Sequence, residues 1–119
     1  MATFSKEKLS ASTDGKGIKV AATATAGTLI HTGSATAATL HEVWLYAVNS
    51  SATDVKLTIE WGEATAPDGN IEYTVKAENG LYLIIPGLIL KGNATALTIK
   101  AFAGTANVIV VHGYVNVIA

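Results

Sequence analysis

Apolar and polar residues alternate along much of the chain after Gly17, with the period of two that is typical of β-strands. The clearest stretch is residues 54–61, in which odd-numbered positions are apolar and even-numbered positions are polar. The apolar positions are Val55, Leu57, Ile59 and Trp61, and the polar positions are Asp54, Lys56, Thr58 and Glu60. Residues 71–76 and 97–101 repeat this pattern. We therefore expect half-buried strands of antiparallel sheets, with their polar faces in solvent.

Three further runs, residues 43–48, 81–85 and 108–118, carry apolar residues on both faces. A strand of this kind in a single-layer sheet would expose one apolar row to water. These runs therefore predict either central strands of a packed assembly or rows of side chains that meet a partner.

Turn signals separate the runs, and Asp68-Gly69 and Asn79-Gly80 are pairs suited to the positive φ of tight turns. The weaker runs 18–23 and 28–32 bring the total to about eight short strands, and no stretch has the 3.6-residue period of an amphipathic helix. The sequence predicts an all-β fold, an antiparallel β-sandwich or jelly-roll-like module that forms a single domain over residues 18–119.

Residues 1–17 differ from the rest because they are mainly Ser, Thr, Lys, Asp and Gly. After Met1, their large apolar side chains are Phe4 and Leu9. Such a segment cannot offset its ordering entropy, about 1–2 kcal/mol per residue, by burying its own surface. We expect an N-terminal arm that is loose or ordered only by lying on something else, and whose removal leaves the fold intact. Residues 1–10 also lack the apolar segment of a secretory signal.

Composition narrows the possible partners. The 119 residues suffice for one domain, and they are 50% apolar and only 14% charged, which excludes intrinsic disorder. The formal net charge is −1, so we expect no nucleic-acid partner.

The most apolar stretch, residues 81–90, is interrupted by Pro86-Gly87 and is shorter than the roughly 20 residues of a membrane helix, so we expect no membrane partner. The absence of cysteine excludes disulfides and thiol chemistry.

Histidine is the first candidate for chemistry. His31, His41 and His112 are too far apart in the sequence to form a local metal clasp. His112 and Asn116 have the spacing of one half of a cupin metal site, but the companion His-x-His motif is absent. We expect no metal and no cofactor. A small cupin-like enzyme with a metal held by His112 and another histidine remains an alternative.

The other candidates for catalysis are also weak. Glu60, Glu63 and Glu72 flank a turn, but Glu60 and Glu72 belong to the polar rows, where we expect solvated charges. Ser34 follows a glycine but lacks the second glycine of a nucleophile elbow. The sequence predicts that the protein is not an enzyme and has no catalytic residue.

Aromatic residues indicate a contact surface. Trp61 shares a face with apolar residues of its strand, so we expect it in the core. Trp44 and Tyr46 share a face with Val48, and the opposite row of the same run is also apolar. One of these two rows is therefore available for a partner. The candidate interface residues are Phe4, Leu9, Trp44 and Tyr46.

Three segments of the chain, Leu40–Gly62, Leu83–Leu90 and Ala101–Asn116, resemble the capsid decoration (cement) proteins of tailed bacteriophages. The resemblance implies a β-sandwich or jelly-roll module that trimerises on the outside of the capsid and clamps neighbouring capsomers. It implies the major capsid protein and identical copies of the chain as partners, in a virion assembled in the host cytoplasm. The alternative is a carbohydrate-binding β-sandwich module on a virion or cell surface, with aromatic residues exposed on one sheet.

Overall fold

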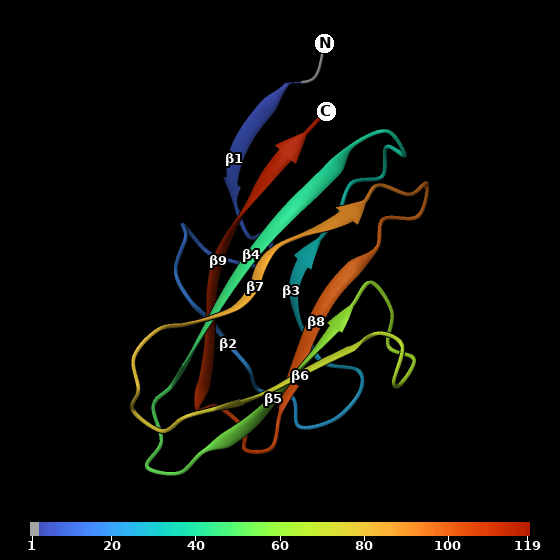
Figure 1. Cartoon of the computed structure of the whole chain (residues 1–119). Helices are drawn as coiled ribbons and strands as arrows, with labels where there is room; N and C mark the ends of the chain where they lie inside the picture. Colours follow the sequence, from blue (N-terminus) through green and yellow to red (C-terminus); the bar gives the residue numbers. More distant parts are fainter. Residues whose placement is uncertain (1–2) are drawn as a thin grey trace.

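A computed structural model describes residues 3–119, which form nine strands and no helix (Figure 1). The strands are β1 (Phe4–Lys8), β2 (Ile18–Lys19), β3 (Thr28–Thr32), β4 (Leu40–Asn49), β5 (Val55–Trp61), β6 (Asn70–Val75), β7 (Tyr82–Lys91), β8 (Thr98–Ala103) and β9 (Ile109–Ile118). The all-β prediction is confirmed. There is one strand more than expected because β1 forms within the segment that the sequence predicts to be an arm.

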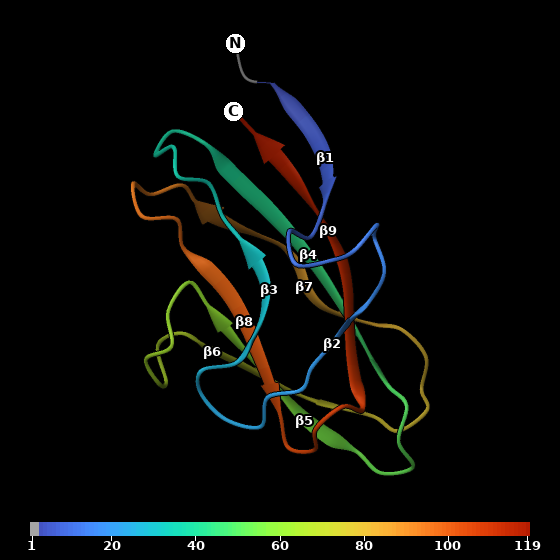
Figure 2. The ribbon, with the colours of Figure 1, turned by 180° about the vertical axis from the view of Figure 1, so that it is seen from behind.

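The strands form two antiparallel sheets that enclose one core (Figure 2). Sheet A has the order β1-β9-β4-β7, and the short β2 also pairs with β9. Sheet B has the order β3-β8-β5-β6. Inward-facing residues of both sheets meet between them, among them Leu45 of β4, Ile59 of β5 and Ile99 of β8. This arrangement is that of an antiparallel β-sandwich.

Strand β4 lies in the middle of sheet A, between β9 and β7, and its burial alternates residue by residue. The row that contains Val43, Leu45 and Ala47 is buried in the core. The row that contains Trp44 and Tyr46 therefore lies on the outer face of sheet A, where it is partly exposed. The structure thus resolves which of the two apolar rows faces inward.

Strand β5 departs from the expected pattern, because Thr58 and Glu60 are buried although they belong to its polar row. Glu60 is only 2% exposed. The segment before β3 covers it: the Thr25 hydroxyl donates to Glu60 Oε2 at 2.8 Å, and the Gly27 amide donates to Oε1 at 2.8 Å. The prediction of a solvated Glu60 is therefore wrong. Glu72, in contrast, is exposed and forms an ion pair with Lys56 at 3.1 Å.

The N-terminal segment pairs with the last strand of its own chain. Strand β1 pairs with the last part of β9, from Phe4 opposite Ile118 to Lys8 opposite Tyr114 (Figure 1), and the backbones of Thr3 and Ala119 exchange hydrogen bonds. All five side chains of β1 are exposed, so backbone pairing holds this strand. Leu9, which follows β1, is 1% exposed and belongs to the core. Residues 1–2 of the expected arm lie outside the described residues.

Strand β7 forms the opposite edge of sheet A, and its pairing with β4 is irregular. The register shifts twice, between Val43 and Trp44 and between Leu45 and Tyr46. Pro86 and Gly87 lie at this irregularity, and Gly87 has a φ of +77°. A Cβ atom at Gly87 would lie 2.8 Å from the Trp44 ring. The bulged strand therefore needs glycine both for its backbone conformation and for the approach of Trp44.

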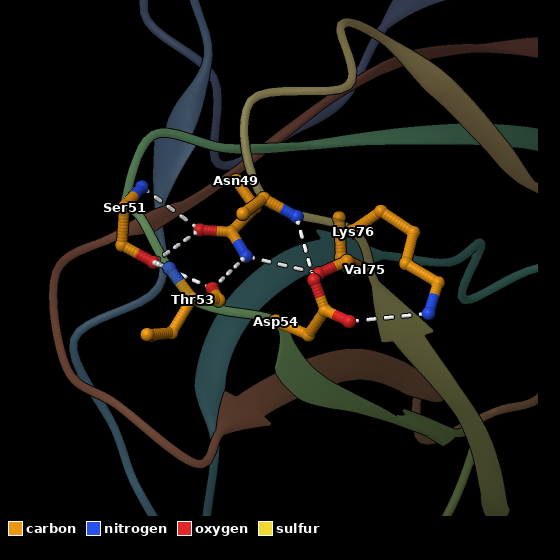
Figure 3. A network of polar contacts seen from close by, with 7 residues as sticks. Asn49, Ser51, Thr53, Asp54, Val75 and Lys76 are labelled. Carbon is orange, nitrogen blue, oxygen red and sulfur yellow. Dashed lines mark hydrogen bonds and ion pairs between the residues drawn. The ribbon is translucent and has the colours of Figure 1, made fainter.

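A polar network at the β4–β5 turn fastens this turn to the end of β6 (Figure 3). Asn49 is buried, and its side-chain amide donates to the carbonyl oxygens of Thr53 and Val75 at 2.8 and 2.9 Å. Asp54 accepts a hydrogen bond from the Ala77 amide, and this bond, together with Lys76, holds the pKa of Asp54 below its ordinary value. The network joins the β4–β5 turn to the end of β6, more than 20 residues away in the sequence, so we interpret it as structural.

Candidate contact surface

The outer face of sheet A carries an aromatic row across two neighbouring strands. Trp44 of β4 lies opposite Tyr114 of β9, and the two rings are nearly parallel, with centroids 6.0 Å apart and planes at 10°. The Lys6 ammonium nitrogen of β1 lies 5.0 Å from the centroid of the Tyr114 ring. Tyr46 belongs to the same outer row of β4. Two of the four predicted interface residues, Trp44 and Tyr46, therefore lie together on one face.

A carboxylate is held beside this aromatic row. Glu42 Oε1 accepts hydrogen bonds from the Asn116 side chain at 2.7 Å and from Trp44 Nε1 at 3.0 Å. These two bonds lower the pKa of Glu42, because they stabilise its charged form. They also fix the orientation of the Trp44 ring on the sheet.

The largest group of exposed apolar side chains lies on and directly before β7. We call this group the β7 surface; its members are 37–57% exposed, and they are Leu81, Tyr82, Leu83, Leu88 and Ile89. Within residues 3–119, β7 has a strand neighbour on one side only. Leu83 lies opposite Tyr46, so the aromatic row of β4 continues onto the β7 surface. Tyr82 stacks on Tyr73 of sheet B, with ring centroids 4.7 Å apart.

The other two predicted interface residues lie elsewhere. Phe4 is 72% exposed on β1, at the edge of sheet A that is opposite to β7. Leu9 is a correction: its side chain is enclosed in the core of this chain and offers no surface to a partner. The sequence predicts for residues 81–85 either a central strand of a packed assembly or a row that meets a partner, and the interface residues named from the sequence did not include the β7 surface.

The fold brings two histidines together that the sequence keeps apart. His31 Nε2 of β3 lies 2.8 Å from His41 Nδ1 of β4, and both side chains are buried. His112 lies on β9 and is partly exposed. In the part of the chain that the structure describes, no three His, Asp or Glu side chains gather in a way that could hold a metal ion.

The surface formed by residues 3–119 has no pocket, and no helix long and apolar enough to cross a membrane is found among them. No family model, curated protein or solved structure matches the chain. The case for a function therefore depends on the surfaces described above.

Proposed function

We propose that this protein is a structural component of a bacteriophage virion that binds the outside of the capsid between capsomers and associates with itself as a trimer. The observation that carries the proposal is the β7 surface, five exposed apolar side chains on one edge of sheet A. Soluble proteins rarely expose contiguous apolar patches of large area unless a partner covers them. The resemblance of three chain segments to decoration proteins names the kind of assembly.

The β7 surface has the composition of an interface centre. Residues 81–90 contain no charged side chain. The centres of protein interfaces are likewise depleted of charged residues and enriched in aromatic residues. Tyr82 is a large side chain that loses little conformational entropy on contact, as hot-spot residues do. The β7 surface is therefore the part of the molecule that we assign to contact between copies.

Phe4, at the opposite edge of the same sheet, is the residue that we assign to contact with the major capsid protein. The order of sheet A separates β1 from β7 by two strands, so one copy can use both edges at the same time. A trimer attached through three such contacts gains avidity, so each contact with the shell can be weak. Attachment would take place on the outer surface of the capsid, after its assembly in the host cytoplasm.

The proposal is tested by sedimentation equilibrium of the purified protein and by its addition to undecorated capsid shells. We expect trimers, and electron microscopy should locate added density between capsomers. Phe4→Ala should weaken binding to shells and leave the trimer intact. Leu29→Ala, at an exposed leucine of β3, is the matched control and should change neither. A monomer that does not bind to shells contradicts the proposal.

A carbohydrate-binding module is the second candidate, and the pairing of Trp44 with Tyr114 beside Glu42 favours it. Aromatic faces with a neighbouring carboxylate are suited to stacking on sugars and to accepting hydrogen bonds from their hydroxyls. In a Trp61→Phe variant the fluorescence reports Trp44 alone, because the chain has two tryptophans. A change in that fluorescence with oligosaccharides supports this candidate, and a glycan array without binding rules it out.

A further inference from the structure

The buried pair His31 and His41 lies where the N-terminal segment meets both sheets. The two side chains are 4% and 8% exposed, and they come from β3 of sheet B and β4 of sheet A. The Ser10 amide, directly after the core residue Leu9, donates to His31 Nδ1 at 3.0 Å. Two hydrogen bonds therefore connect the N-terminal segment to His31 and His31 to His41.

The direction of both hydrogen bonds is fixed by chemistry. A backbone amide can only donate, so His31 Nδ1 must be the acceptor and must carry no proton. The neutral ring of His31 then carries its proton on Nε2, which donates to His41 Nδ1 at 2.8 Å. Both Nδ1 atoms are therefore occupied as acceptors in the neutral pair.

An added proton cannot be placed on this pair without the loss of a hydrogen bond. A proton on His31 Nδ1 would face the donor proton of the Ser10 amide. A proton on His41 Nδ1 would face the proton of His31 Nε2. This clash is avoided if the His31 proton moves to Nδ1, but His31 then loses the hydrogen bond from the Ser10 amide. Every protonated form of the pair thus breaks the link to the N-terminal segment or the link between the rings.

We propose that protonation of the His31–His41 pair releases residues 4–12 from the sandwich while the two sheets remain folded. The largest remaining attachment of this segment is the burial of Leu9 in the core, which release must overcome, and the others are few. Strand β1 pairs with β9 alone and buries none of its side chains. Beyond it, the Thr32 amide donates to the Ser10 hydroxyl, and the Ala11 amide donates to the Ile30 carbonyl at a longer distance of 3.3 Å. Strands β3 and β4, in contrast, each have their own sheet partners.

The surroundings of the pair keep it neutral at pH 7. Burial is the main cause that lowers the pKa of His31, to about 4, and the neighbouring His41 and Lys8 lower it further. Burial also lowers the pKa of His41. The opposing group is Glu7, whose charge raises both pKa values, but Glu7 is exposed on β1 and does not offset burial.

The direction of the pH effect follows from these shifts. In the released state the rings are in water and take up protons at their ordinary pKa of 6.5. The attached state takes up the proton on His31 only near pH 4. Attachment is therefore fully present above pH 6.5 and is lost as the pH falls from 6.5 towards 4. One proton taken up on release changes the equilibrium tenfold per pH unit, and two protons change it more steeply.

Native-state amide exchange between pH 7 and pH 4.5, corrected for intrinsic rates, tests the proposal on the full chain. We expect the protection of the Ser10 amide and of the β1 amides to fall at least tenfold per pH unit below 6.5. The amides of Leu57 and Ile59 in β5 should keep their protection. Parallel loss of protection in β1 and β5 would mean global unfolding and would overturn the proposal, as would an N-terminal segment that stays protected at pH 4.5.

His41→Asn is the informative variant because its side-chain oxygen can replace the Nδ1 acceptor without titrating. It should retain attachment at pH 7 and make the pH dependence shallower. His112→Gln removes a histidine outside the pair and should behave like the wild-type protein. A pH dependence in His41→Asn that equals that of the wild type contradicts the proposal.

A measurement on the wild-type protein covers the case in which His41→Asn does not fold. At pH 7, ¹⁵N spectra of the imidazole rings should show His31 neutral, with its proton on Nε2. A charged His31, or one with its proton on Nδ1, would overturn the proposal.

Discussion

The two edges of sheet A differ in chemistry although they belong to the same sheet. Strand β1 reads Phe-Ser-Lys-Glu-Lys, and its charged residues are in solvent. Strand β7 has no charged residue before Lys91 and exposes a cluster of apolar side chains. Charged side chains on an edge strand discourage pairing with other chains, whereas an apolar edge attracts them. The comparison shows that β1 has the charged side chains that discourage strand pairing, whereas β7 lacks them up to Lys91.

The most severe test of the β1 edge is the removal of residues 1–17. The sequence predicts an intact fold without them, but the burial of Leu9 in the core now leads us to expect a large loss of stability. The loss should exceed the roughly 2–5 kcal/mol expected for one core leucine. Chemical denaturation should show it. Removal of residues 1–8 alone, which spares Leu9, should cost much less, and equal costs would contradict this account.

Two substitutions compare the core leucine that follows β1 with an exposed leucine of β7. Leu9→Ala should lower the free energy of unfolding by about 2–5 kcal/mol, because it leaves a cavity in the core. Leu83→Ala, at a side chain that is 37% exposed on β7, should lower it by less than about 1 kcal/mol. Urea denaturation at low protein concentration measures both values. A larger effect at Leu83 would show that β7 belongs to the core of the monomer.

Leu88→Lys tests the apolar edge itself. A charge at the centre of an interface typically costs about 1–3 kcal/mol, so the association constant between copies should fall at least about fivefold, as measured by sedimentation. The stability of the monomer should change by no more than about 0.5 kcal/mol, because the side chain is already 44% exposed. Leu29→Lys on β3 is the matched control. Equal association of both variants would remove β7 as the contact surface.

The smallest expected effect is that of Lys6→Ala on the charged edge. The Lys6 ammonium lies 5.0 Å from the Tyr114 ring centroid, and an exposed contact of this kind stabilises by about 0.5–1 kcal/mol. Amide exchange of β1 should therefore accelerate by a few-fold, while global stability remains nearly unchanged. Lys19→Ala, at an exposed lysine of β2, should leave the exchange of β1 as it is.

The sequence predicts most strands because alternation reports burial directly. Residues 54–61, 71–76 and 28–32 correspond closely to β5, β6 and β3. Strand β1 escapes prediction because none of its side chains is buried, so its order depends on backbone pairing with β9. The pattern also cannot show which row of residues 43–48 faces inward, since both rows are apolar.

The surroundings of the candidate residues are harder to predict than the strands, because they arise from contacts between segments that are distant in the sequence. Glu60 belongs to a polar row, and its burial arises from hydrogen bonds to Thr25 and Gly27, far away in the sequence. His31 and His41 meet because β3 and β4 belong to different sheets that pack together. The exposure of β7 follows from its place at the end of a sheet, which no local pattern records.

The irregular middle of β7 has a consequence for how copies can meet. Pro86 has no N–H to donate, and Gly87 bends the backbone away from a regular strand. An incoming strand therefore finds no continuous ladder to extend. Side chains of another copy can pack here, but its strands cannot extend the sheet without limit. An apolar edge of this kind is therefore compatible with small closed oligomers and resists the formation of fibres.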